Sequence, residues 1–125
     1  MHRTGRGFTL IELLVVLAII ATLLTLAVPR YFQHVERSKE AVLRENLATV
    51  RNAIDQYHAD TGAWPASLEV LVEKRYLRRL PTDPITETSD SWQIVPPPDA
   101  DTTGIYDLHS GADGTALDGS AYAEW

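Results

Sequence analysis

The sequence contains no cysteine. This absence excludes disulfide bonds, a thiol nucleophile and any metal site built on thiolates. No glycine-rich loop of the kind that holds phosphates follows an expected strand. The classes of enzyme and metalloprotein that need these groups are therefore excluded.

A catalytic cluster of side chains is also missing. His34 and His58 lie too far apart on one expected helix to share a site, His109 is isolated, and His2 precedes the main apolar segment. The pattern offers neither a nucleophile with a nearby base nor a set of metal ligands at suitable spacing. We therefore expect that the chain is not an enzyme.

Basic residues are absent from the C-terminal part of the chain. From Ile85 onward there is no Lys or Arg, and the formal net charge of the whole chain is -6. The acids of this part are Glu87, Asp90, Asp99, Asp101, Asp107, Asp113, Asp118 and Glu124. Such a surface repels nucleic acid and attracts cations, so no nucleic-acid partner is expected.

A long apolar segment is present near the N-terminus. Residues 8–28 are apolar apart from one acid and a few threonines, and a helix of this length crosses a hydrocarbon core of about 30 Å. Arg3 and Arg6 precede it and should keep the N-terminus in the cytoplasm. A secretory signal peptide is the alternative interpretation, but no small-x-small cleavage pattern closes the segment. We expect a retained membrane anchor.

Glu12 is the acid inside this segment. A charge within hydrocarbon costs at least ~2.5 kcal/mol, so intramembrane acids are usually paired and functional. A partner on a neighbouring subunit is one solution. The other is that the side chain of Glu12 extends to the membrane–water interface or is protonated.

The stretch "GFTLIELLVVLAIIATLLTLAVP" resembles the N-terminal signature of type IV pilins and type II secretion pseudopilins. The resemblance implies that a prepilin peptidase cleaves a short basic leader after Gly7 and methylates the new N-terminal residue, Phe8. It also implies that Glu12 pairs with the N-terminal amine of a neighbouring subunit during filament assembly. N-methylation keeps the positive charge of the amine. The amine and the carboxylate of Glu12 therefore attract each other strongly in a medium of low dielectric.

Residues 29–61 continue as an amphipathic helix. Apolar residues recur there at spacings of three and four and predict a buried face; they are Leu43, Leu47, Val50, Ile54 and Tyr57. Gly62 should end the helix. Pro29 deletes one helical hydrogen bond, so a kink or local melting is expected there, as a passive bend or as a hinge. In the family a glycine that eases unwinding occupies the position of Ala21, so this chain should melt less readily.

Residues 62–125 predict a small globular domain. Ser67 can cap a short helix whose Leu68, Leu71 and Val72 cover the long one. Residues 92–95 and 105–108 predict short strands of an antiparallel sheet. The order of "DTGAWP", short helix and "YLRRLPTDP" resembles the major (G-type) pseudopilin, although the segment after Pro84 departs from that family. The expected fold is α+β and pilin-like: a long N-terminal helix with a transmembrane and an amphipathic half, a small antiparallel sheet and an acidic C-terminal loop.

The last loop, "SGADGTALDGSAYAEW", contains Asp113 and Asp118 between glycines. A similar loop binds calcium in the major pseudopilins, so the resemblance implies a calcium site at these two carboxylates. Calcium needs six to eight oxygen ligands. The next acids of the family, an Asp-Ala-Asp stretch, would fall on Gly119, Ser120 and Ala121, which do not supply them. A plain turn is the alternative.

Together these patterns predict a leader (1–7), a transmembrane helix (8–28), an amphipathic helix (29–61) and a globular domain (62–125). The resemblance implies a homo-oligomeric periplasmic pseudopilus that helps move folded proteins through the outer membrane. Its implied partners are minor pseudopilins, the prepilin peptidase and an inner-membrane assembly platform. The implied location is the inner membrane, single-pass, with the C-terminal domain in the periplasm. The alternative is a type IV pilus pilin used in adhesion, motility or DNA uptake.

Overall fold

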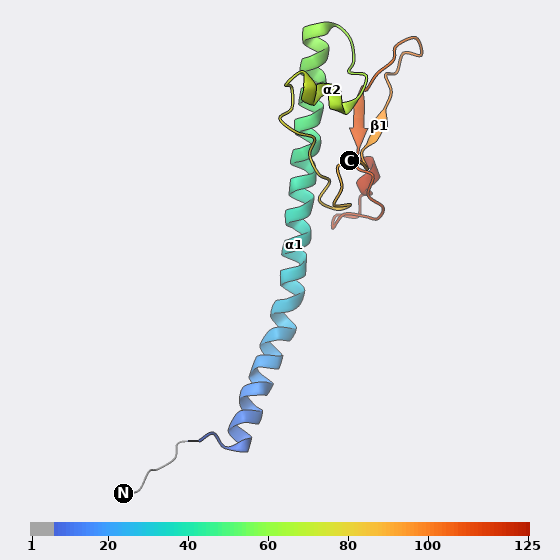
Figure 1. The fold of residues 1–125 in the computed structure, drawn as a ribbon. Coiled ribbons are helices and arrows are strands. Elements are labelled where there is room, and N and C mark those ends of the chain that lie inside the picture. Colours follow the sequence, from blue (N-terminus) through green and yellow to red (C-terminus); the bar gives the residue numbers. More distant parts are fainter. Residues whose placement is uncertain (1–6) are drawn as a thin grey trace, which may run out of the picture. The chain divides into compact units, whose positions relative to one another are not determined.

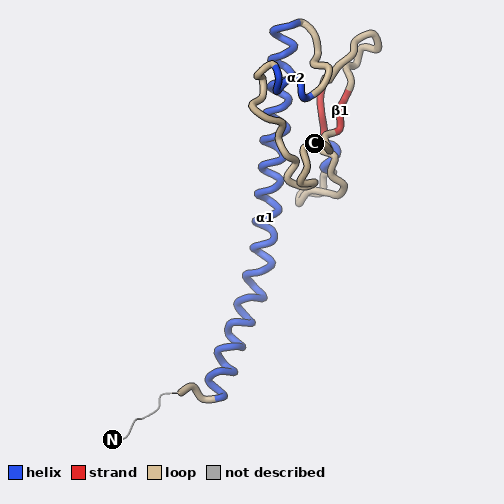
Figure 2. The backbone as a smooth tube through the Cα atoms, viewed as in Figure 1, coloured by secondary structure: helices blue, strands red, loops and turns tan. Residues whose placement is uncertain are grey.

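The computed structural model describes residues 7–125, so Arg3, Arg6 and His2 lie outside the described residues. The described elements are the helices α1 (Leu10–Thr61) and α2 (Leu68–Glu73), the strands β1 (Gln93–Val95) and β2 (Asp107–His109), and the 3-10 helix η1 (Tyr122–Glu124). Figures 1 and 2 show their order along the chain. The chain divides into two units between Val35 and Glu36. The expected α+β, pilin-like fold is confirmed.

The first helix begins two residues later than the apolar segment does. Thr9 caps it: its hydroxyl accepts a hydrogen bond from the N–H of Glu12 at 3.1 Å, and α1 starts at Leu10. The chain stays helical through Pro29, so the local melting expected there does not occur in this structure. The kink itself stays a prediction.

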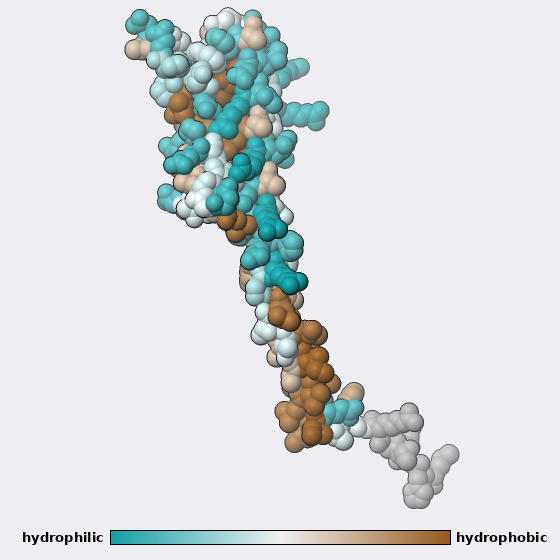
Figure 3. Space-filling view, turned by 180° about the vertical axis from the view of Figure 1, so that it is seen from behind, coloured by the Kyte–Doolittle hydropathy of each residue, from teal (hydrophilic) through white to brown (hydrophobic). Residues whose placement is uncertain are grey.

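The first unit presents apolar side chains on all sides of α1. Phe8, Leu10 and Ile11 are exposed, as are the large side chains that follow as far as Val28. An 18-residue window of the helix has a mean hydropathy of 2.7, and none of the window is buried. Figure 3 shows this surface as a brown band. A helix of this length and composition can cross a membrane.

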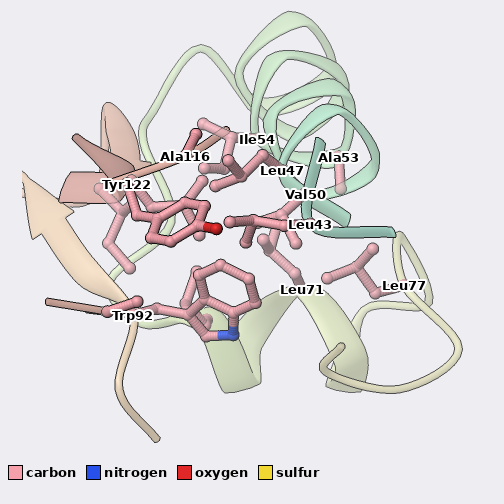
Figure 4. Close-up of a cluster of buried hydrophobic side chains, with 14 residues drawn as sticks. Leu43, Leu47, Val50, Ala53, Ile54, Leu71, Leu77, Trp92, Ala116 and Tyr122 are labelled. Carbon is pink, nitrogen blue, oxygen red and sulfur yellow. The ribbon is translucent and has the colours of Figure 1, made fainter. Parts of the chain in front are cut away.

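In the second unit, one face of α1 forms the core. Leu43, Leu47, Val50 and Ile54 are almost fully buried, as their spacing predicts. Figure 4 shows them facing Leu71 of α2 together with side chains from the C-terminal half of the chain. Burying each such side chain contributes about 1.5–3 kcal/mol. Tyr57, the last residue of the predicted stripe, is only partly buried and packs edge-on against Tyr76.

The connection from α1 to α2 follows the sequence rules. Gly62 has φ = 75°, a left-handed conformation that glycine adopts without strain, and its N–H donates to the carbonyl of His58. The hydroxyl of Ser67 accepts a hydrogen bond from the N–H of Val70 and so caps α2. Leu68 is buried beneath this cap. The predicted helix end and helix start are confirmed.

The sheet has two antiparallel strands, in which Gln93 pairs with His109 and Val95 with Asp107. The predicted bounds of the second strand, 105–108, were wrong by about two residues. Ile105 is drawn out of the sheet because its N–H donates to the carbonyl of Pro65. Gly104 makes this approach possible, since a Cβ there would lie 2.8 Å from that of Trp64.

Trp92 precedes β1 instead of belonging to it, and it contributes to the core. Its indole ring is buried and its Nε1–H donates to the carbonyl of Pro81 at 3.0 Å. A buried indole usually needs such an acceptor. The hydrogen bond therefore holds the segment before β1 against Pro81.

Asp83 is a fully buried carboxylate that the sequence patterns did not reveal. It accepts hydrogen bonds from the N–H groups of Ile85 and Thr86 at 2.8 and 3.3 Å, and from the hydroxyl of the equally buried Ser110. The Ser110 hydroxyl in turn accepts from the N–H of Ala112. Asp83 thus joins the turn after α2 to the segment that follows β2.

Replacing Asp83 by Ala should destabilise the second unit. The change leaves two backbone donors and the Ser110 hydroxyl without their acceptor, which costs about 2–3 kcal/mol. The melting temperature should fall on the order of 10 °C. Thermal unfolding followed by tryptophan fluorescence measures this, with Asp90→Ala at an exposed acid as the matched control. Equal melting temperatures for the two variants would contradict the assignment.

Candidate functional site

The N-terminal site consists of Gly7, Phe8, Thr9 and Glu12. Thr9 and Glu12 form a capping box: the Thr9 hydroxyl accepts from the Glu12 N–H, and Glu12 Oε2 accepts from the Thr9 N–H at 3.4 Å. Sequence reasoning missed Thr9, although Thr-x-x-Glu before an apolar run is a recognisable signal. The capping box places the carboxylate of Glu12 beside the start of the helix.

The carboxylate of Glu12 can accept further hydrogen bonds. A carboxylate has about four acceptor positions, and the capping bond at 3.4 Å is long. Glu12 is exposed within the single chain. The acid can therefore accept a further donor at the beginning of the helix.

Gly7 and Phe8 precede the helix and are accessible. The Phe8 side chain is 83% exposed, and a Cβ added at Gly7 would meet no atom within 4 Å. An exposed peptide bond outside the helix suits recognition by a peptidase. The roles of Gly7 and Phe8 remain predictions.

The other polar side chains of the apolar segment are satisfied within the helix. The hydroxyl of Thr22 donates to the carbonyl of Ala18, and that of Thr25 donates to the carbonyl of Thr22. Such bonds make hydroxyls tolerable in an apolar medium. Glu12 therefore differs from the threonines, since a charge is not neutralised by a backbone bond.

The C-terminal loop, residues 110–125, includes η1 and contains the two acids predicted to bind calcium. Asp118 Oδ1 accepts from the N–H of Ser120 at 2.9 Å and from its hydroxyl at 2.6 Å, while Oδ2 lies 3.8 Å from Nη2 of Arg44. The Ser120 hydroxyl, its N–H and then Arg44 lower the pKa of Asp118. Asp113 is exposed. Both acids therefore lie at the surface, with Asp118 already hydrogen-bonded.

These residues do not fit a metal site built from side chains. Within residues 7–125 no group of three or more His, Asp or Glu residues is placed to hold a metal ion. Gly119 and Ala121, where the resembling family has acids, supply no side-chain oxygen. The calcium site implied by the resemblance stays a prediction.

Glu40 of α1 holds the end of this loop. Its Oε1 accepts from the N–H of Leu117 at 2.7 Å and from the hydroxyl of Tyr122 at 3.0 Å. Tyr122 is buried, and burial together with the bond to Glu40 raises its pKa to about 12. The phenol is thus held in its neutral, donating form.

Arg51 of α1 joins the sheet to the last described residue. Its Nε donates to Asp107 Oδ1 at 2.8 Å, and its Nη2 donates to the main-chain oxygens of Leu108 and Trp125. His109 Nδ1 lies 3.0 Å from the same oxygen of Trp125. Sequence periodicity could not find this cluster, because Arg51 is more than fifty residues from each of the residues that it contacts.

Replacing Tyr122 by Phe should cost about 1–2 kcal/mol, since Glu40 loses a donor. The free energy of unfolding of the variant should also fall less than that of wild type as the pH rises into the alkaline range. A folded-state pKa of about 12, above the ordinary value of 10.0, contributes stability that is complete below pH 10 and is lost as the pH rises towards 12. Urea unfolding at pH 8 and at pH 11 measures this, with Tyr106→Phe as the control. An equal loss of stability in wild type and Tyr122→Phe would contradict the role of the phenol.

Comparison with known proteins gives a consistent result. The model of the prokaryotic N-terminal methylation motif matches residues 3–28. The type II secretion system core protein G of Pseudomonas aeruginosa is 34% identical over 130 residues, covering 90% of this chain and 87% of the relative. The proteins of the same name from Vibrio cholerae and Escherichia coli are 31% and 33% identical, and the chain covers 84% and 83% of them.

A relative with a different name matches a shorter part of the chain. The fimbrial protein EcpC of Eikenella corrodens is 41% identical over 66 residues, which cover 53% of this chain and 43% of the relative. No solved structure matches the chain. The methylation motif, the apolar helix and the long matches together show that this chain belongs to the family of type II secretion system core protein G, the pseudopilins.

Proposed function

We propose that the chain is the major subunit of a periplasmic pseudopilus that helps move folded proteins through the outer membrane. The observation that carries this proposal is the exposed apolar helix with one acid in its first turn. Large apolar surfaces of this kind require lipid or other helices as partners. In a filament, the helices of neighbouring subunits replace lipid.

Processing would generate the partner of Glu12. Cleavage by the prepilin peptidase after Gly7 frees the amine of Phe8, and methylation keeps its positive charge. The amine of one subunit then pairs with Glu12 of its neighbour, and the pair removes the cost of each charge in a medium of low dielectric. The capping box prepares Glu12 for this step because it orients the carboxylate towards the start of the helix.

Before assembly, the subunit would reside in the inner membrane as a single-pass protein with its C-terminal domain in the periplasm. The apolar helix and the methylation motif fit such an anchor. The proposed partners are further copies of the chain, minor pseudopilins and an inner-membrane assembly platform. Extraction from the membrane into the filament follows from pairing at Glu12.

A type IV pilus pilin is the second candidate. The similarity to a fimbrial protein over 53% of the chain favours it. The relatives named core protein G instead match 87–90% of the chain in the three cases compared, so their similarity extends beyond the N-terminal helix. Secretion by cells that lack the gene distinguishes the candidates, because loss of the major pseudopilin abolishes export of folded proteins and leaves surface pili intact.

Cleavage after Gly7 predicts a defined mass. Protein extracted from membranes of cells with an active prepilin peptidase should begin at Phe8 and carry one additional methyl group. Intact-mass spectrometry with N-terminal fragmentation measures both changes. Protein that begins at Met1 in these cells would contradict the processing step, and cells without the peptidase provide the control.

Replacing Glu12 by Gln should abolish filaments while leaving membrane insertion intact. Gln can still form the capping box but carries no charge, so the substitution separates pairing from helix capping. Filaments sheared from cells that overproduce the chain should fall at least about tenfold, as expected for a loss of 1.4 kcal/mol or more. Glu73→Gln, at an exposed acid of α2, is the matched control. Normal filaments from Glu12→Gln would refute the charge pair.

A further inference from the structure

The C-terminal loop raises a question that the proposed function leaves open. The family resemblance implies that calcium fastens this loop, yet the His, Asp and Glu side chains of the part of the chain that the structure describes form no group that could hold a metal ion. A loop with glycines at several positions is costly to order, because each fixed residue loses about 1–2 kcal/mol of backbone entropy. Other contacts must therefore offset that cost.

The first set of contacts lies within the loop. The Ser120 hydroxyl donates to Asp118 Oδ1 at 2.6 Å and accepts from Nε1 of Trp125 at 2.8 Å. One hydroxyl thus links the acid to the indole. Ser120 lies between Gly119 and Ala121, the two positions where the family's acids are missing.

The second set of contacts reaches the loop from α1. The guanidinium carbon of Arg44 lies 3.7 Å from the ring centroid of Trp125, while Nη2 of Arg44 lies 3.8 Å from Asp118. Stacking of a guanidinium on an indole contributes about 0.5–1 kcal/mol at an exposed site. Arg44 therefore supplies positive charge beside Oδ2 of Asp118.

Glu40 and Arg51 continue this polar row along α1. With Arg44 they lie four and seven residues apart, which places all three on one face of the helix. Glu40 holds Leu117 and Tyr122, and Arg51 holds Leu108 and the main-chain oxygen of Trp125. The row contacts the loop at its middle and at its end.

We propose that in this pseudopilin the C-terminal loop is fastened to α1 without a metal ion, by the row Glu40, Arg44 and Arg51 together with the Ser120 link between Asp118 and Trp125. A positive side chain and a hydroxyl take the place of the divalent cation. This fastening is independent of filament assembly, so it can be tested on the subunit alone.

The test is thermal unfolding of the full chain in detergent micelles with calcium, with magnesium and with a chelator. Wild type should melt at the same temperature in all three conditions. A melting temperature that rises specifically with calcium would overturn the proposal. Equilibrium dialysis against radioactive calcium provides a second measurement, in which saturable binding of one ion to the folded chain would also overturn it.

A variant tests the contacts themselves. Ser120→Ala removes both hydrogen bonds of the hydroxyl and should lower the melting temperature by about 4–8 °C, equally in calcium and in chelator. Ser38→Ala, at an exposed position of α1, is the matched control and should melt as wild type does. Arg44→Gln should lower the melting temperature in the same way, because it loses the charge near Asp118 and the stacking on Trp125. Unchanged melting temperatures of Ser120→Ala and Arg44→Gln in the chelator would overturn the proposal.

Discussion

A single helix has to be compatible with two surroundings, and this constraint governs the rest of the molecule. Before Pro29, the side chains of α1 are apolar on all sides, and nothing in their own unit covers them. After Val35, the apolar residues follow one stripe, and the polar residues beside it find partners in the globular unit. The sequence pattern changes between the apolar part of α1 and the part that belongs to the globular unit, whereas the backbone stays helical throughout.

Packing against the second half of α1 explains how so small a domain can be ordered. Its sheet has two strands of three residues each, which would be marginal alone. The apolar stripe of α1 supplies one wall of the core, and the polar row of Glu40, Arg44 and Arg51 holds the loop that closes the other side. Side chains of α1 and buried hydrogen bonds such as those of Asp83 therefore help to order the chain beyond α2.

Local patterns in the sequence predicted those parts that depend on local rules. The buried stripe at Leu43 and Leu47, the end at Gly62 and the cap at Ser67 all follow from helical spacing and terminal chemistry, and the structure confirms them. Strand bounds were less accurate because Ile105 is pulled towards Pro65 by a contact distant in sequence. Short strands carry too little periodicity to reveal such a shift.

The candidate sites likewise contain residues that local sequence patterns reveal and residues that contacts distant in sequence determine. Glu12 was recognisable because one acid in an apolar run is unusual, and its cap by Thr9 follows a known motif that was overlooked. The environment of Asp118 could not be anticipated, since Arg44 comes from a segment distant in sequence and the hydroxyl of Ser120 resembles that of any turn residue. Buried Asp83 was equally hidden, because its partner Ser110 is 27 residues away.

Glu40 and Arg51 contact residues that are far away in the sequence, and this has a consequence for the order of folding. Glu40 bonds to residues 77 and 82 positions further along the chain, and Arg51 bonds to Trp125 across 74. Contacts of such sequence separation form late, because loop closure must precede them. Synthesis proceeds from the N-terminus, so Leu43 and Leu47 emerge long before the residues that cover them. Until the final residues are available, the nascent domain exposes a helix with an open apolar stripe, a natural target for chaperones and a point of vulnerability to proteolysis.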